Sequence, residues 1–150
     1  MLEALISILI FSFGILGLIG IQANAVGLSI DAKYRADAAY LANQIVSQMW
    51  VDRANMDSYA HLPVGTPCDS ATGTGATGSN STNGNVYPST TGSWTYQVSQ
   101  SLPGASADKQ QIKVTTPGGT ATRLIEVTLC WKRPTDSQWH KHATTTQVYQ

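Results

Sequence analysis

An uncharged stretch at the start of the chain constrains its fold more than any other feature. Residues 4–30 contain no charged side chain, and between Ala4 and Ile21 only Ser7 and Ser12 are polar. About twenty apolar residues let a helix cross a hydrocarbon layer about 30 Å thick. A small domain has too little interior to enclose such a helix. The stretch therefore predicts a single membrane-spanning helix within residues 1–30.

A cleaved signal peptide is the main alternative for this stretch. Ala23-Asn24-Ala25 resembles the small-residue cleavage site of such peptides, and cleavage there would release a secreted binding domain that begins at Val26. However, the chain opens with Met1-Leu2-Glu3 and not with basic residues, and its apolar run is longer than the usual 7–15 residues. These two observations favour a helix that is retained.

The polar remainder of the chain excludes several classes of function. Nine basic and nine acidic residues give no net charge, whereas a nucleic-acid binder carries a clustered basic excess. The sequence shows no phosphate-binding loop, no G-x-S-x-G turn and no C-x-x-C pair. We therefore expect no enzymatic activity, no cofactor, no small-molecule substrate and no nucleic-acid partner.

Helical periodicity continues directly after the uncharged stretch. Apolar residues recur at spacings of three and four, which is typical of one face of a helix. They are Tyr34, Ala38, Leu41, Ile45, Val46, Met49 and Met56. No proline interrupts residues 1–62, so one helix is predicted from near the N-terminus to about Ala54. Its second half, residues 31–56, is amphipathic and should lie against a protein domain.

Residues 57–150 are predicted to form a globular β-domain with a loop over residues 65–93. Within Ser70–Ser93, twenty of twenty-four residues are Gly, Ser, Thr, Asn or Pro. Alternating or β-rich segments predict four antiparallel strands near residues 94–99, 111–116, 121–132 and 139–149. One face of that sheet is apolar and would be covered by the amphipathic part of the helix. The expected fold is α+β, a long helix packed on an antiparallel sheet.

Two cysteines and three glycines are candidate structural sites. Cys68 and Cys130 are the chain's two cysteines, and in a loop-rich domain outside a membrane they predict one disulfide, with two free thiols as the alternative. Gly14, Gly17 and Gly20 either allow close helix packing or reflect the general glycine content of membrane helices.

His140 and His142 could share one face of a strand, as two metal ligands would. Zinc needs a third or fourth protein ligand, and the remaining histidine is His61. A polar strand face is therefore the favoured interpretation, and no metal site is predicted.

The N-terminal residues resemble those of the type IV pilin-like proteins. Leu2-Glu3-Ala4-Leu5-Ile6 is similar to the glutamate-containing signature of that family, and residues 10–22 resemble those of its minor pilins. The C-terminal segments 127–132 and 144–148 show a weaker similarity. The resemblance implies a pilin fold, a precursor held in the inner membrane with its domain in the periplasm, and later incorporation into a pilus at the cell surface.

Further expectations about partners come from this resemblance alone. In the family, a prepilin peptidase removes a leader that ends in glycine and methylates the new N-terminus. Subunits then assemble with other pilins and minor pilins through a bundle of N-terminal helices, in which a glutamate pairs with a neighbour's terminal amine. Carried over, that residue is Glu3. A minor pseudopilin of a type II secretion system is the alternative.

One departure from the family pattern concerns the numbering of this glutamate. The family's glutamate is the fifth residue of the processed chain, whereas Glu3 is the third residue here. The resemblance thus implies either that translation starts upstream of Met1 or that the N-terminus has been trimmed.

Overall fold

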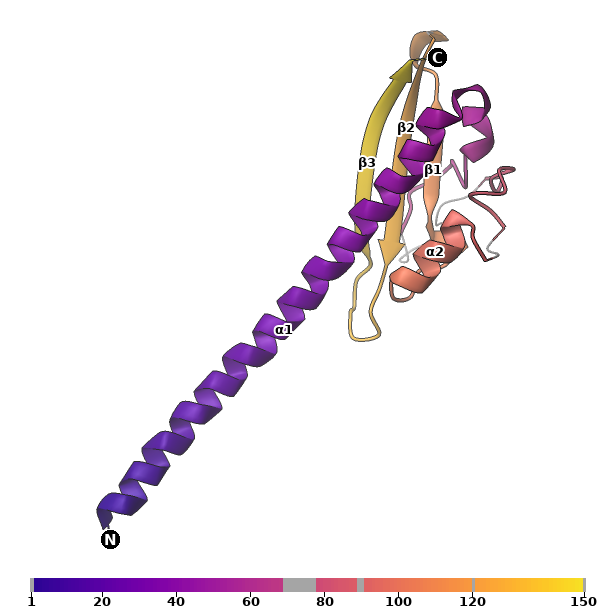
Figure 1. Ribbon diagram of the computed structural model, residues 1–150. Coiled ribbons are helices and arrows are strands. Elements are labelled where there is room, and N and C mark those ends of the chain that lie inside the picture. Colours follow the sequence, from indigo (N-terminus) through magenta and orange to yellow (C-terminus); the bar gives the residue numbers. More distant parts are fainter. Residues whose placement is uncertain (1, 69–77, 89–90, 120, 150) are drawn as a thin grey trace. The chain divides into compact units, whose positions relative to one another are not determined.

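The computed structural model describes residues 2–68, 78–88, 91–119 and 121–149. Its contacts divide the chain into two units, Met1–Tyr34 and Arg35–Gln150, and α1 runs through both. The elements, labelled in Figure 1 where space allows, are α1 (Leu2–Val51), η1 (Arg53–Tyr59), α2 (Trp94–Ser101), η2 (Ala107–Lys109), β1 (Gln111–Thr115), η3 (Pro117–Gly119), β2 (Thr122–Trp131) and β3 (His140–Tyr149).

The predicted long helix is confirmed as α1, with an end three residues earlier than expected. Asp52 leaves the helical conformation, at φ −103° and ψ 55°, and the chain continues as the 3-10 helix η1. The Arg53 side chain donates a hydrogen bond from Nε to the Trp50 carbonyl oxygen at 3.2 Å. This bond satisfies one of the carbonyl groups that every helix leaves open at its C-terminal end.

A three-stranded antiparallel sheet forms the centre of the second unit. Its order is β1-β2-β3, so that β2 is the central strand. Ile125 lies opposite Val114 of β1 and Thr146 of β3, which fixes the register on both sides. The predicted strands near residues 111–116, 121–132 and 139–149 are therefore confirmed.

The strand predicted near residues 94–99 is wrong, and the sheet has three strands instead of four. Residues Trp94–Ser101 form the helix α2. Ser93 caps its N-terminus, because the Ser93 hydroxyl accepts a hydrogen bond from the Tyr96 amide. Trp94 and Val98 are both buried, and their spacing of four suits one face of a helix as well as one face of a strand. Alternation over six residues could not distinguish these two possibilities.

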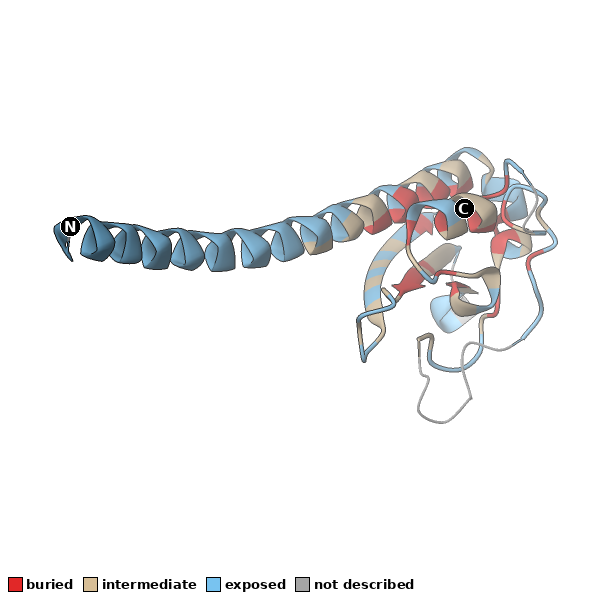
Figure 2. Cartoon of the chain, turned by 90° about the horizontal axis from the view of Figure 1, so that it is seen from below, coloured by how far each residue is buried: buried red, intermediate tan, exposed pale blue. Residues whose placement is uncertain are grey.

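The core of the second unit lies between the C-terminal part of α1 and one face of the sheet. The helix buries Ala38, Leu41, Ala42, Ile45, Val46 and Met49, which appear as a stripe on one side of the helix in Figure 2. Alternate residues of β2 complete the layer, namely Ile125, Val127, Leu129 and Trp131. Each large apolar side chain buried in this way contributes about 1.5–3 kcal/mol. The structure is thus α+β, with the long helix packed on an antiparallel sheet.

The predicted disulfide between Cys68 and Cys130 is confirmed, with the two Cα atoms 5.6 Å apart. It ties the described start of the Gly/Ser/Thr-rich loop to the central strand β2. Residues 69–77 and 89–90 of this loop lie outside the described residues. The described part is anchored, because Val86 is buried and the Ser81 hydroxyl donates to the Ser58 carbonyl oxygen at 2.6 Å.

Candidate assembly site

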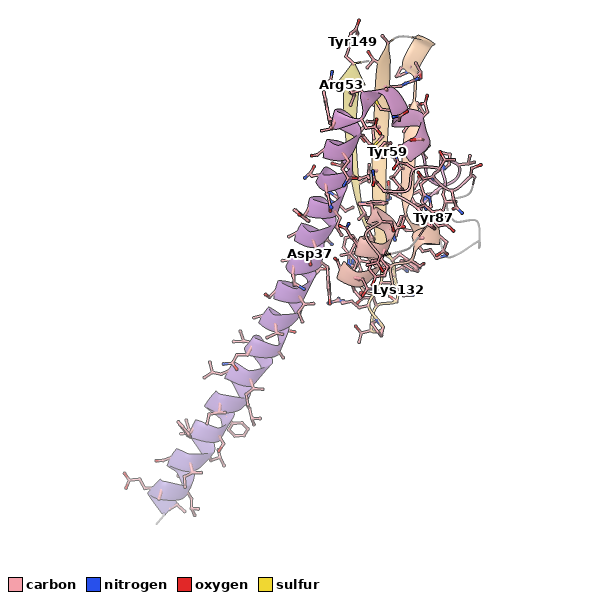
Figure 3. The ribbon with its side chains drawn as sticks, turned by 45° about the vertical axis from the view of Figure 1, so that its right-hand side comes forward. Asp37, Arg53, Tyr59, Tyr87, Lys132 and Tyr149 are labelled. Atoms are coloured by element: carbon pink, nitrogen blue, oxygen red, sulfur yellow. A yellow bond between two sulfur atoms is a disulfide. The ribbon has the colours of Figure 1, made fainter. Side chains whose placement is uncertain are left out.

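The N-terminal segment of α1 presents a predominantly apolar surface. Every residue from Leu2 to Ile30 is exposed (Figure 2), and the side chains point away from the helix in all directions (Figure 3). By length and composition, α1 is able to span a membrane. Soluble monomers rarely expose a contiguous apolar surface of this size. The surface is thus compatible with burial in a membrane.

The two serines of the most apolar stretch, Ser7 and Ser12, are satisfied within the helix. The Ser7 hydroxyl donates to the Glu3 carbonyl oxygen at 2.9 Å, and the Ser12 hydroxyl donates to the Ile8 carbonyl oxygen at 2.8 Å. A helix already pairs its own backbone groups, and an unpaired polar group in hydrocarbon costs several kcal/mol. Both serines are thus compatible with an apolar environment.

Glu3 is the one charged group of the segment and lies in the first turn of α1. Residues 2–30 contain no Lys, Arg or His, and the first cation along the helix is Lys33. Thirty residues of helix separate Glu3 from Lys33 by about 45 Å. A partner for the Glu3 carboxylate within an apolar layer must therefore come from outside this segment.

Gly14, Gly17 and Gly20 lie on a side of α1 that its own chain leaves open. A Cβ atom built on any of the three would meet no other atom within 4 Å. Because residues three apart are rotated by about 60° on a helix, the three glycines cover about a third of its circumference. The chain's own packing does not require glycine there, and close approach by another helix stays a prediction.

One of the two histidines considered as possible metal ligands, His140, has another role. His140 and His142 lie opposite Trp131 and Leu129, respectively, and thus share one face of β3 as expected. The His140 ring stacks on Trp131, with 5.7 Å between centroids, and its Nε2 atom lies 2.9 Å from Asp136 Oδ2. The pKa of Asp136 is lowered to about 2, mainly because the Arg133 side chain donates hydrogen bonds to this carboxylate. Within the described residues, no three His, Cys, Asp or Glu side chains are grouped as metal ligands.

His61 joins three segments of the second unit, which the sequence did not indicate. It is fully buried, with its Nε2 atom 2.9 Å from the Ala107 carbonyl oxygen. Its Nδ1 atom accepts a hydrogen bond from the Ser81 amide at 3.2 Å, so the ring is neutral and protonated on Nε2. Burial lowers the pKa of His61. A lone histidine in a polar segment carries no sequence signal for this role.

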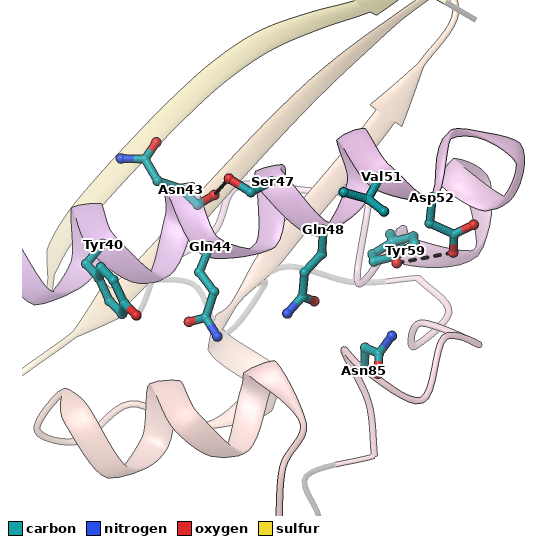
Figure 4. A pocket seen from close by; sticks show the side chains of 9 residues that line it. All are labelled: Tyr40, Asn43, Gln44, Ser47, Gln48, Val51, Asp52, Tyr59 and Asn85. Carbon is teal, nitrogen blue, oxygen red and sulfur yellow. Dashed lines mark hydrogen bonds between the residues drawn. The ribbon is translucent and has the colours of Figure 1, made fainter.

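A groove of about 660 Å³ lies beside the C-terminal part of α1, within the second unit. Gln44 and Gln48 form its floor, Tyr40 and Val51 mark its two ends along the helix, and Asn85 faces them (Figure 4). Nothing in the local sequence pattern indicates a groove at these residues. The groove forms because η1 and the loop around Asn85 fold back towards the helix.

Comparison with known proteins adds no relative, because no family model, curated protein or solved structure matches the chain. The structure itself establishes an α+β fold, a disulfide, and one N-terminal helix that is long and apolar enough to span a membrane. These features are compatible with a single-pass membrane protein.

Proposed function

We propose that this chain is a minor type IV pilin, a structural subunit that takes part in priming and assembling type IV pili through its N-terminal helix. Its sequence resembles the minor pilin PilV, the type IV pilus modification protein. In this proposal, α1 first anchors the subunit in the bacterial inner membrane, with the β-domain in the periplasm. After a prepilin peptidase has processed the precursor, the same helix packs among other pilins in the pilus.

One observation carries the proposal: a fully exposed apolar helix with a single carboxylate, Glu3, in its first turn. In a bundle of such helices Glu3 would lie in an apolar environment, where an unpaired charge is strongly destabilising. The terminal amine of a neighbouring subunit would provide the missing cation. The apolar surface thus supports the bundle, and Glu3 would determine the axial position of one subunit relative to the next.

Substitution of Glu3 tests this proposal in a strain that lacks the chromosomal copy. Glu3→Ala should leave membrane insertion of the full chain intact but reduce the number of surface pili several-fold. Glu126→Ala is the matched control, because Glu126 is the chain's other glutamate and lies on β2. Normal piliation with Glu3→Ala would contradict the proposal, as would recovery of a mature protein that begins at Val26.

A minor pseudopilin of a type II secretion system is the alternative, since an apolar helix with an N-terminal glutamate would serve either assembly. The resemblance of residues 10–22 to minor pilins favours the pilus. Deleting the gene separates the two functions. Loss of pili with normal protein secretion is expected, whereas loss of secretion with normal pili would support the pseudopilin.

A further inference from the structure

We infer that the groove beside Gln44 and Gln48 binds a neutral, hydroxyl-rich ligand, namely a short segment of a saccharide. This inference concerns the second unit and does not depend on the proposed assembly role. The groove volume of about 660 Å³ lies within the range of small-molecule sites, about 300–1,000 Å³. Its lining combines apolar surface with several convergent polar groups, which is also typical of such sites.

The charge of the lining selects against anionic ligands. Of the nine lining residues, Asp52 is the one with a charge, and none is Lys, Arg or His. The Asp52 carboxylate already accepts hydrogen bonds from Asn55 Nδ2 at 2.8 Å and from the Tyr59 hydroxyl at 3.2 Å. Burial is the largest cause that raises the pKa of Tyr59, and the negative charge of Asp52 is the next. The Tyr59 hydroxyl therefore stays protonated and can donate. A phosphate or carboxylate ligand would find no cation in this lining.

The floor of the groove contains hydrogen-bond acceptors that the chain leaves unused. Gln44 Nε2 donates to Gln97 Oε1 at 3.0 Å, but Gln44 Oε1 and Gln48 Oε1 are buried and have no partner among the described residues. A buried acceptor without a donor costs about 1–3 kcal/mol. Such costs are expected mainly at functional sites. Both oxygens have almost no exposed surface as the side chains stand. The terminal amide of glutamine rotates readily, and such a rotation would turn the oxygens towards a ligand hydroxyl in the groove.

The distribution of side chains favours a saccharide over a peptide. Extended peptides are usually bound through the backbone of a sheet edge, whereas the wall here is a helix whose backbone groups are paired internally. An amphipathic helix would lay apolar side chains over the Gln44 and Gln48 amides and leave these amides without hydrogen-bond partners. Side-chain amides both donate and accept, as sugar hydroxyls do. Tyr40, 69% exposed, offers a ring on which the apolar face of a sugar can stack.

Binding is tested with the full chain in lipid nanodiscs, since sugar-based detergents would compete. The probes are maltotriose, cellotriose and the neutral N-acetylated chitotriose, each followed by the NMR shifts of the side-chain amides. At least one probe should shift the signals of Gln44 and Gln48 in the unmodified chain. An uncharged hexapeptide serves as the comparison probe.

Two leucine substitutions then locate the site. Gln44→Leu and Gln48→Leu should each weaken binding about fivefold, the effect of one lost hydrogen bond. The control is Gln147→Leu, an exposed glutamine on β3 outside the groove, which should change the affinity less than twofold. The inference is overturned if no saccharide binds at about 10 mM, if the hexapeptide alone binds, or if the shifts in the unmodified chain avoid Gln44 and Gln48.

Discussion

The two parts of α1 show how one helix serves two different environments. Residues 4–30 carry no charge and present apolar side chains on all sides, and every one of these residues is exposed. From Arg35 to Val51 the apolar residues form a stripe, and that stripe is buried against the sheet. A helix that is apolar on all sides needs a partner that surrounds it, whereas a stripe needs only one apolar face. The comparison shows that the way apolar residues are distributed around a helix decides whether it needs a surrounding apolar environment or a single apolar surface.

The two regions also treat their polar groups differently. In the N-terminal segment, the Ser7 and Ser12 hydroxyls bond to the helix backbone and need no external partner. In the domain, polar side chains bridge separate elements. For example, Gln110 Nε2 donates to the Cys130 carbonyl oxygen at 3.1 Å, and Gln110 Oε1 accepts from the Cys130 amide at 2.9 Å. The two serines of the first region therefore need no tertiary contact, whereas the domain depends on its own tertiary structure.

Removing the disulfide should have the largest effect, and this effect should be confined to the domain. The Cys68–Cys130 bond spans 62 positions of sequence, and its loss in a Cys68→Ala/Cys130→Ala double variant should cost the domain about 4 kcal/mol on the chain-entropy model. Denaturant unfolding of the domain measures this loss. Membrane association through residues 2–30 should be unchanged, and a variant that leaves the membrane would show that the two regions are not independent.

A charge in the apolar segment should have the next largest effect. Leu16→Arg replaces an exposed apolar residue near the middle of the uncharged stretch, and should disfavour membrane insertion by about 3 kcal/mol. Tyr40→Arg is the control, because Tyr40 is exposed on the part of α1 that belongs to the domain. Membrane fractionation compares the two variants. Equal insertion of both would argue against a membrane-spanning role for residues 2–30.

Two matched substitutions, each of which removes one methylene group, test the comparison further. Ile45→Val removes one methylene group from a residue with no exposed surface and should destabilise the domain by about 1 kcal/mol. Ile15→Val makes the same change in the N-terminal segment, where Ile15 is 41% exposed, and should leave domain stability unchanged. Thermal unfolding followed by near-ultraviolet circular dichroism measures both. An equal loss in both variants would mean that Ile15 also contributes to the core of the domain.

The smallest effect at neutral pH should come from His61. Because burial lowers the pKa of His61 in the folded chain, the unfolded chain binds more protons below pH 6.5, the ordinary value for histidine. The contribution of His61 is therefore complete above pH 6.5 and is lost as the pH falls towards the folded pKa. Unfolding experiments between pH 7 and pH 5 should show this decline in the unmodified chain. In His61→Gln the decline should be shallower, and identical slopes would contradict this role.

Local sequence patterns were sufficient for several features of the fold. The spacing of Leu41, Ile45 and Met49 predicted the buried face of α1, since the helical period is a property of the local backbone. The alternation of Ile125, Val127 and Leu129 predicted the buried face of β2 for the same reason. The disulfide was predictable because the chain contains two cysteines in a loop-rich domain that we expected to lie outside a membrane.

Other features required contacts between distant residues. The Trp94 ring donates from Nε1 to the Leu41 carbonyl oxygen at 2.9 Å, 53 positions away, and this bond helps to hold α2 beside α1. The short segment around Trp94 has no long periodicity to indicate a helix, so it was predicted as a strand. The role of His61 and the groove beside Gln44 likewise depend on loops that approach from elsewhere in the chain.

The sequence by itself determined that the chain has a long helix, apolar all round over residues 4–30 and striped beyond, because periodicity and the absence of charge are local properties. The tertiary structure alone decided that residues 94–101 form a helix, that the described sheet has three strands, and that a groove opens along α1. Those outcomes depend on which distant surfaces bury one another, and no local pattern encodes that choice.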